Sequence, residues 1–220
     1  LVAMDLGFHS LVDVLIRNED RIEVKNRALA VAVERKRVDL VELLVSCGAE
    51  IRSVALCDVL LTWEPQMIQF FLDHGADVIT GAPFAYAFRE RVRTALRPYV
   101  EYKKAHFELA ATLQEQADRA LRHFCYEGDL KWVSLLLWAG ANPRSRGPDM
   151  DDRWADDPEC HTTALNEACS KGNLDVLKKI KTDPRSDDLS ELLSSAALAT
   201  SKETIEYLLS ISANPNDKPN

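Results

Sequence analysis

The sequence has 220 residues, of which 46% are hydrophobic and 28% are charged, and its formal net charge is −8. These proportions are those of an ordinary soluble chain rather than a disordered one, and the acidic balance argues against a nucleic-acid partner, because phosphate binding favours a basic surface. No apolar run approaches the roughly 20 residues of a membrane-spanning helix, and Leu1–Ile16 lacks the basic leader of a signal peptide, so we expect no membrane contact.

Short apolar helical patterns recur in pairs along the chain, and a single turn residue, here called the anchor, divides each pair. In the clearest pair, Leu121, Phe124 and Cys125 precede the anchor, and an apolar face from Trp132 to Leu136 follows it. Neither helix could bury its apolar stripe alone, so neighbouring pairs are expected to stack. The expected anchors are Gly7, Lys36, Trp63, a residue near position 91, Gly128, Gly172 and Thr200.

The first three pairs are short and regular. The spacing between their anchors is 29 and then 27 residues, and the second and third pairs close at Gly48-Ala49-Glu50-Ile51 and Gly75-Ala76-Asp77-Val78. Pro65 falls in the first turn of the helix after Trp63, where the missing N–H costs little. These features predict short helical pairs, each closed by a turn.

The fourth pair departs from this pattern. Gly81–Phe88 resembles the start of a pair, but the following segment has no Gly and a single Pro, Pro98. Aromatic and apolar residues then recur at helical spacing, so we predict an elongated second helix from about Pro98 to Gln116 within an irregular unit near 83–116. The basic residues between Arg89 and Lys104 form either a solvated face or a docking patch.

The last three pairs are separated by an expansion. The polar segment over residues 142–161 is about 11 residues longer than the period requires, so we expect an expanded loop there. The next pair has Gly172 as its anchor, and the last has Thr200. Ser212-Ala213-Asn214-Pro215 then repeats the earlier closure Gly140-Ala141-Asn142-Pro143 in all but the first residue.

The opening Thr163-Ala164-Leu165-Asn166-Glu167-Ala168-Cys169 and the Gly-Ala closures resemble the ankyrin repeat. The resemblance implies an all-α solenoid of about seven stacked helix-turn-helix units with little or no β-structure. It implies one ankyrin-repeat domain over residues 1–220, with a helical insertion at 89–116 and a loop insertion at 142–161. Both ends fall inside repeats, which favours a piece of a longer protein.

One family residue is missing, and this leaves alternatives open. The first-helix His of the family, six residues before the anchor, is replaced in the units around Lys36, Trp63, Gly128, Gly172 and Thr200. The replacing residues are Ala30, Cys57, Arg122, Asn166 and Ser194. Since that His normally ties adjacent turns together, its loss predicts irregular turns and keeps TPR or HEAT solenoids as alternatives.

In ankyrin-like proteins the partner contacts the finger loops between pairs and the exposed face of the first helices. Carried over position by position, the partner-binding candidates are Arg52, Asp58, Asp77, Arg122, His123, Arg144, Arg146, Trp154 and Glu167. The resemblance therefore implies a non-catalytic, monomeric scaffold that binds another protein. The alternative is a targeting or regulatory segment of an enzyme whose catalytic domain lies outside this chain.

Motifs for reaction chemistry are missing from the sequence, which has no P-loop, G-x-G-x-x-G, G-x-S-x-G or H-E-x-x-H. We therefore predict no catalytic, cofactor-binding or metal-binding residues. In the acidic segment Asp149–His161, Trp154 and Cys160 stand where an EF-hand needs Gly and Glu, and a Cys160–His161 zinc site lacks two further ligands. Trp154 either packs inward or contacts a partner. Small-molecule sensing near the aromatic fourth unit is a third functional hypothesis.

The five cysteines indicate a reducing, cytoplasmic setting. Their number is odd, their spacing is irregular and no C-x-x-C pair occurs. Cys125 and Cys169 fall at small core positions of their helices, so we expect them to be buried as free thiols.

Overall fold

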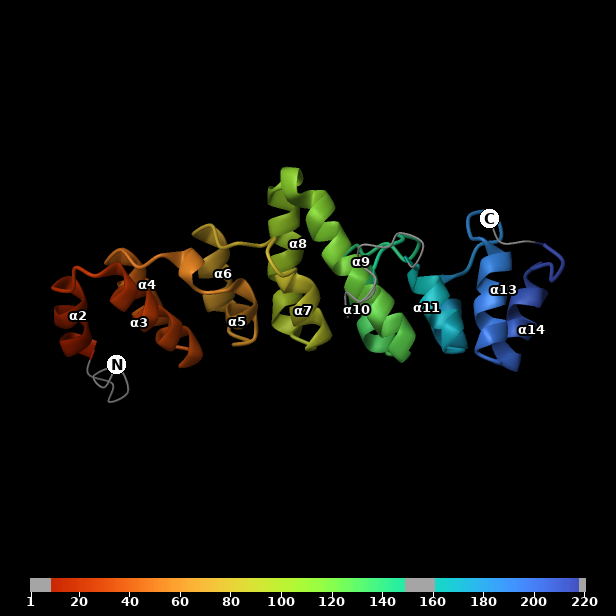
Figure 1. The fold of residues 1–220 in the computed structure, drawn as a ribbon, viewed down its shortest axis with the longest axis horizontal. Coiled ribbons are helices and arrows are strands. Elements are labelled where there is room, and N and C mark those ends of the chain that lie inside the picture. The colour runs from red at the N-terminus through yellow and green to blue at the C-terminus, as the bar shows by residue number, and fades with distance from the viewer. Residues whose placement is uncertain (1–8, 149–160, 218–220) are drawn as a thin grey trace. The chain divides into compact units, whose positions relative to one another are not determined.

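The computed structural model describes the backbone of residues 9–148 and 161–217 (Figure 1). Within these ranges there are 13 α-helices, three short 3-10 helices and no β-strand; one isolated antiparallel bridge joins Gly147 and Thr162. The protein is therefore all-α, as predicted. No helix in the described ranges combines the length and apolar content needed to cross a bilayer.

The chain folds as two compact units, where the sequence predicts one domain over residues 1–220. Unit 1 covers Leu1–His106 and unit 2 covers Phe107–Asn220. The elements of unit 1 are α2 (His9–Arg17), α3 (Ile22–Glu34), α4 (Val38–Ser46), η1 (Ile51–Ser53), α5 (Leu56–Leu60), α6 (Pro65–Asp73), α7 (Pro83–Arg89), η2 (Arg93–Ala95) and α8 (Leu96–Ala105). Those of unit 2 are η3 (Phe107–Leu109), α9 (Ala110–Glu127), α10 (Leu130–Trp138), α11 (Ala164–Ser170), α12 (Leu174–Ile180), α13 (Leu189–Leu198) and α14 (Lys202–Ser210).

Left-handed residues end the first helix of every described pair. The backbone φ is positive at Lys36, Trp63, Arg91, Gly128, Gly172 and Thr200, with values from +54° to +77°. These are the six anchors expected from the sequence that the structure describes; Gly7 lies outside the described residues. Four of the six are not glycine, although this φ favours glycine. The repeated packing of the helix pairs, rather than the preference of the residue itself, therefore fixes the turn at these four positions.

The second helices end in the same way at four positions. Gly48, Gly75, Gly140 and Ser212 have φ values of +77° to +93°. In each case the following alanine donates its N–H to a carbonyl five residues back, as Ala141 does to Leu136 at 2.9 Å. A left-handed residue followed by this backbone bond satisfies carbonyls that a helix end would otherwise leave unpaired. The repeated sequence closure thus corresponds to a repeated turn.

Within each unit, the helix pairs stack in two layers. In unit 1, α3 contacts α5 and α5 contacts α7, whereas α2 contacts α4 and α6 contacts α8. In unit 2, α9, α11 and α13 follow one another in one layer, and α10, α12 and α14 follow one another in the other. First helices therefore pack on first helices and second helices on second helices, which buries the stripe that no single pair could bury.

The prediction of one elongated helix from Pro98 to Gln116 is wrong. Helix α8 ends at Ala105, and His106 leaves the helical region at φ −120° and ψ 74°. The imidazole Nδ1 of His106 lies 3.0 Å from the carbonyl of Tyr102, and the two rings stack at 3.9 Å, so this side chain closes α8. The long helix is instead α9, whose 18 residues extend the helix before Gly128 back to Ala110.

The core agrees with the apolar pattern of the pairs. Trp132 is 3% exposed and stacks on Phe124 with ring centroids 5.1 Å apart. Cys125 and Cys169 are fully buried free thiols, as expected. Burial raises the pKa of both, that of Cys169 to about 12, because the thiolate would be desolvated.

Candidate functional site

The buried guanidinium of Arg122 organises the loop between α10 and α11. We call this loop the finger and define it as the described residues 139–148 and 161–163. Arg122 on α9 is 2% exposed; it donates to the carbonyls of Pro148 at 3.1 Å and Ser145 at 3.3 Å, and pairs with Glu115. Gly147 covers this pair so closely that a Cβ there would meet both the guanidinium and the carboxylate. The finger therefore folds over Arg122, which was predicted to contact a partner, and leaves only 2% of it exposed.

A second set of hydrogen bonds fixes the start of the finger. The buried carboxylate of Asp118 accepts the N–H of Asn142 at 2.6 Å, and Gln114 donates to the carbonyl of Gly140 at 2.8 Å. In unit 1, Asn26 holds the same register position and accepts the N–H of Glu50 at 2.9 Å. The first helix of a pair thus holds the backbone that leaves its second helix.

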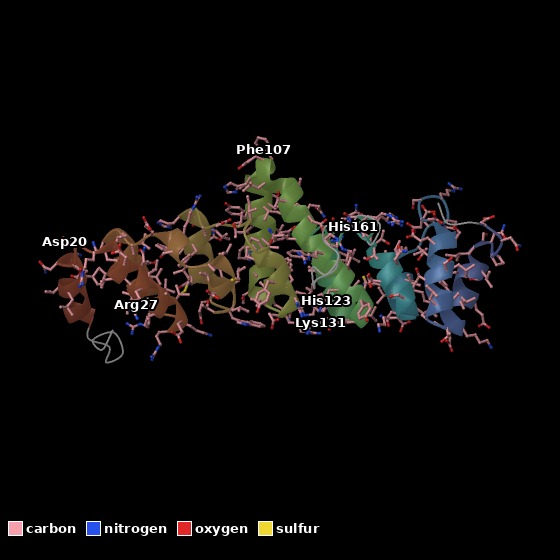
Figure 2. The ribbon with its side chains drawn as sticks, viewed as in Figure 1. Asp20, Arg27, Phe107, His123, Lys131 and His161 are labelled. Carbon is pink, nitrogen blue, oxygen red and sulfur yellow. The ribbon has the colours of Figure 1, made fainter. Side chains whose placement is uncertain are left out.

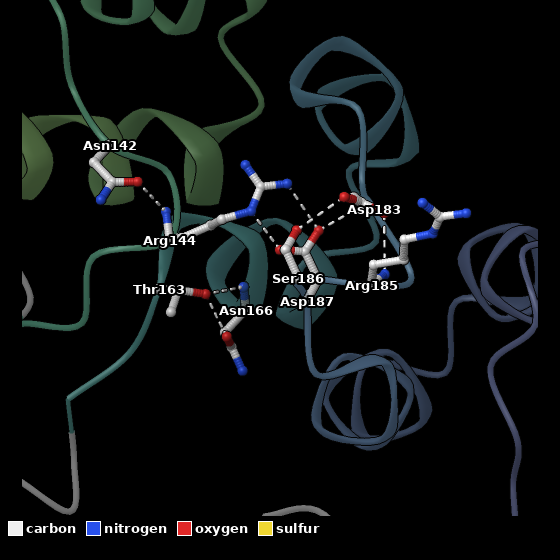
Figure 3. A network of polar contacts seen from close by, with 8 residues as sticks. All are labelled: Asn142, Arg144, Thr163, Asn166, Asp183, Arg185, Ser186 and Asp187. Carbon is white, nitrogen blue, oxygen red and sulfur yellow. Dashed lines mark hydrogen bonds and ion pairs between the residues drawn. The ribbon is translucent and has the colours of Figure 1, made fainter.

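Two ion pairs join the finger to α13 and to the loop that precedes it. Arg144 donates through Nε to Asp187 Oδ1 at 2.6 Å and through Nη2 to Oδ2 at 3.0 Å (Figure 3). This two-point geometry makes the pair directional, and the Asp187 side chain is only 2% exposed beneath it. Arg146 pairs with Glu191 on α13 and donates to the carbonyl of His161 at 3.2 Å.

These residues border an open hollow of about 180 Å³ in unit 2, which we call the finger hollow. The residues that line it belong to the finger, to α11 and to the segment that leads into α13. They are Arg144, Arg146, Thr163, Leu165, Asn166, Ser186, Asp187, Asp188, Glu191 and Leu192. The side chains of Arg144 and Arg146 are 36% and 50% exposed, so both remain partly accessible to solvent although they are ion-paired.

Helix caps hold the floor of the finger hollow in place. The Thr163 hydroxyl accepts the N–H of Asn166 at 3.1 Å and also contacts the Asn166 side chain (Figure 3). At the start of α13, the Asp188 carboxylate accepts the N–H groups of Ser190 and Glu191, each at 3.1 Å. Both helices therefore begin at a capped end that faces the hollow with fixed side chains.

The loop before α13 has its own carboxylate network. Asp183 accepts the N–H of Arg185 at 3.0 Å and the hydroxyl of Ser186 at 3.2 Å, and these bonds lower its pKa below the ordinary value of 3.8. Asp187 accepts the N–H of Asp183 at 2.7 Å. The carboxylate that receives Arg144 is thus itself fixed by the backbone.

Of the nine predicted partner-binding residues, the structure brings Arg144 and Arg146 together at the finger hollow. Glu167 lies nearby on α11, where it accepts the Thr162 hydroxyl at 2.6 Å. His123 does not line the hollow; it lies toward the α9–α10 turn, whereas His161 lies at the finger (Figure 2). Trp154 lies outside the described residues.

The remaining candidates belong to unit 1. Arg52 donates to the carbonyl of Gly75 at 3.1 Å. Asp77 accepts the N–H groups of Ile79 and Thr80 at 2.9 and 3.0 Å. Hydrogen bonds from Thr80, with that from Ile79, lower the pKa of Asp77 to about 2. Asp58 is exposed on α5. Arg52 and Asp77 therefore stabilise turns of their own unit.

The sequence did not single out the acidic half of the hollow. Asp187, Asp188 and Glu191 lie 40 or more residues from Arg144 and Arg146, where the chain enters the first helix of the last pair. The one available signal was the run Asp187-Asp188 before an apolar helical pattern, which is typical of a helix N-cap.

Metal binding finds no support in the described side chains. Within residues 9–148 and 161–217, no three His, Cys, Asp or Glu side chains gather where they could share a metal ion. The acidic segment considered for cation binding, 149–160, falls outside the described residues. No protein-family model matches the chain, and a search of curated proteins returns no match.

Proposed function

We propose that this chain is a degenerate ankyrin-repeat scaffold that binds another protein at the finger hollow and carries out no reaction of its own. The observation that carries the proposal is the set of ion pairs that hold Arg144 and Arg146 half-exposed at the rim of an open hollow. Side chains already fixed in place lose little conformational entropy when a partner binds.

The ankyrin assignment rests on three supports. The helix pairs stack first helix on first helix, the pairs close with the Gly-Ala turn of the family, and Thr163 caps α11 within the sequence that resembles the family's opening. At the position of the missing family His, Arg122 ties the finger to its first helix through the carbonyls of Ser145 and Pro148. A different residue thus supplies a comparable tie in this unit.

A protein partner fits the surroundings of the hollow. The chain carries a net charge of −8, which opposes the approach of a nucleic acid. Interfaces between proteins favour Arg, whose planar group bonds carboxylates and carbonyls while its stem packs against apolar surface. The four described cysteines are free, which fits a reducing, cytoplasmic setting, and we take the scaffold to be monomeric.

A charge swap tests the proposal without dismantling the fold. The double variant Arg146→Glu with Glu191→Arg keeps an ion pair between the same positions but reverses the charges that the hollow presents. Affinity purification from the native host, followed by mass spectrometry, should lose the partners that the unaltered chain recovers. We expect at least a tenfold loss for the partner that uses this rim, about 1.4 kcal/mol.

The matched control swaps the exposed pair Lys202–Glu206 on α14, whose side chains are 80% and 63% exposed in the same unit. Lys202→Glu with Glu206→Lys should recover the original partners. Circular dichroism and thermal unfolding must show that both double variants fold. Equal recovery of every partner by the two double variants would rule out the finger hollow as the binding site.

A further inference from the structure

Unit 1 exposes a large side chain at three successive turns, those between α3 and α4, between α5 and α6, and between α7 and α8. Lys36, Trp63 and Arg91 occupy these turns with φ values of +57°, +65° and +61°, and all three are exposed, Trp63 by 43%. The same turns of unit 2 hold two glycines and a threonine. Because a side chain is disfavoured at this φ, large residues at all three turns indicate a role outside the turn itself.

These three turns lie along one edge of unit 1. The helices that precede them pack side by side, since α3 contacts α5 and α5 contacts α7 (Figure 1). Each of these helices returns through its turn into a second helix, so their three C-terminal ends share an edge. Packed helices lie about 8–10 Å apart, so the row from the first turn to the third is about 16–20 Å long. We call the side chains of Lys36, Trp63 and Arg91 the turn edge.

One backbone geometry holds the three residues of the turn edge. The N–H groups of Lys36, Trp63 and Arg91 each donate to the carbonyl three residues earlier, at 2.9, 3.1 and 2.8 Å. The middle turn is held further by the buried Thr62, whose hydroxyl accepts the N–H of Glu64 at 3.2 Å. A ligand therefore meets three side chains on a backbone that is already fixed, which limits the conformational entropy lost on binding.

The two ends of the turn edge are basic and its middle is aromatic. Residues 34–39 and 89–93 together carry six Lys or Arg and three Asp or Glu. The pairing of Arg37 with Asp39 at 2.9 Å engages one of these cations within the first turn. The indole of Trp63 offers a broad apolar surface between the two basic ends. A ligand that matches this row has a carboxylate at each end and an apolar group between them.

A peptide matches these charges better than a nucleic acid does. Each of the three turns also carries a glutamate, Glu34, Glu64 or Glu90, and these carboxylates would oppose a continuous line of phosphates. A peptide can place its two carboxylates at the cations alone. An extended chain rises about 3.3 Å per residue, so carboxylates about six residues apart span the row, and alternate side chains between them face it.

We propose that the turn edge binds an acidic, extended peptide segment of a partner protein. Lys36 and Arg91 each contact a carboxylate of the segment, and the indole of Trp63 covers an apolar side chain between them. This second surface lies in unit 1 and is independent of what the finger hollow binds. Replacing Lys36 or Arg91 with glycine removes a contact to the peptide and relieves the backbone at a φ that favours glycine. Binding and stability should therefore change in opposite directions, which a merely structural role would not produce.

The probe is a fluorescein-labelled peptide of nine residues with glutamate at its second and eighth positions, leucine at its fourth and sixth, and serine elsewhere. Fluorescence anisotropy with the 220-residue chain measures its affinity. We expect Lys36→Gly with Arg91→Gly to weaken binding at least about tenfold, while urea unfolding shows this double variant to be no less stable than the unaltered chain. Trp63→Gly should weaken binding at least about threefold. Glutamine in place of both peptide glutamates, or a rise in salt from about 50 mM to about 500 mM, should weaken it about tenfold.

Two controls separate the turn edge from general effects. Thr200→Gly makes the same backbone change at a turn of unit 2, and Arg17→Gln removes an exposed cation of unit 1 that pairs with Asp13. Both should keep the affinity for the probe. The proposal is overturned if the folded double glycine variant binds the probe within twofold of the unaltered chain, or if the glutamine peptide binds equally well.

Two further results would also overturn the proposal. One is the absence of saturable binding by the unaltered chain up to about 1 mM probe. The other is tighter binding of an oligothymidine of about ten nucleotides than of the probe, lost in the double glycine variant, because the turn edge would then be a surface for single-stranded nucleic acid.

Discussion

Replacing Arg122 with methionine should release the finger while leaving the helix stacks folded. The guanidinium is 2% exposed and binds two finger carbonyls and the carboxylate of Glu115. Methionine fills much of the same volume but leaves the carbonyls of Ser145 and Pro148 without this donor, at a cost of about 1–3 kcal/mol each if they stay buried. Glu115 is 41% exposed and can be solvated, and the finger can open to water, so we expect a net loss of about 2–3 kcal/mol.

Urea unfolding followed by circular dichroism measures this loss, and amide hydrogen exchange locates it. We expect faster exchange in peptides from 142–148 and 161–163, with the α13 and α14 peptides changing less. Arg97→Met is the control, since Arg97 is 85% exposed in its pair with Glu101 and should cost less than about 0.5 kcal/mol. If Arg122→Met costs no more than Arg97→Met and finger exchange is unchanged, the buried cation does not organise the finger.

Three further predictions concern the turns and the thiols. Lys36→Gly should stabilise the protein by up to about 1 kcal/mol, because Lys36 has a φ of +57° that favours glycine. Gly128→Ala should destabilise it by about 1–2 kcal/mol, because the residue has a φ of +77° and its new Cβ would lie 3.0 Å from Asn173. Urea unfolding measures both changes. The folded-state pKa of Asp77 is depressed to about 2 from 3.8, so its contribution to stability is present above pH 3.8 and lost as the pH falls toward 2; an Asp77→Ala variant should show a flatter stability profile over this range. In a Cys160→Ser background, an aromatic disulfide reagent should react with the half-buried Cys47 and Cys57 in the folded protein and with the buried Cys125 and Cys169 only on unfolding.

The turns of the repeat could be predicted because their causes are local. A helix that ends in a left-handed residue needs only the residue itself, an apolar stripe before it and a bond back into the last turn. The spacing therefore located Trp63 and Thr200 as anchors, although neither is a glycine, and both have positive φ. Burial of Cys125 and Cys169 followed from the same register.

The break after α8 and the burial of Arg122 could not be predicted from the pattern. Tyr102, His106 and Ala110 keep helical spacing across the break, so periodicity alone favoured one helix. Helix α8 ends where the imidazole of His106 contacts the carbonyl oxygen of Tyr102. The sequence pattern does not show which histidine makes such a contact. The position of Arg122 predicted exposure, but a finger of unusual length covers it, and the path of a long loop depends on non-local contacts.

The same non-local contacts explain why specificity is expected at the finger hollow rather than on the regular pairs of unit 2. The regular turns of that unit are held by backbone bonds that any similar repeat makes, so they offer a partner few distinguishing groups. In the finger, by contrast, Arg144 and Arg146 are oriented by Asp187 and Glu191, which lie in a different repeat. A substitution at Asp187, whose side chain is 2% exposed, would therefore change the position of a rim arginine without removing an exposed group. A comparable loss of binding in the two variants, with Asp187→Asn weakening it nearly as much as Arg144→Ala, would distinguish this positioning from a simple sum of charges.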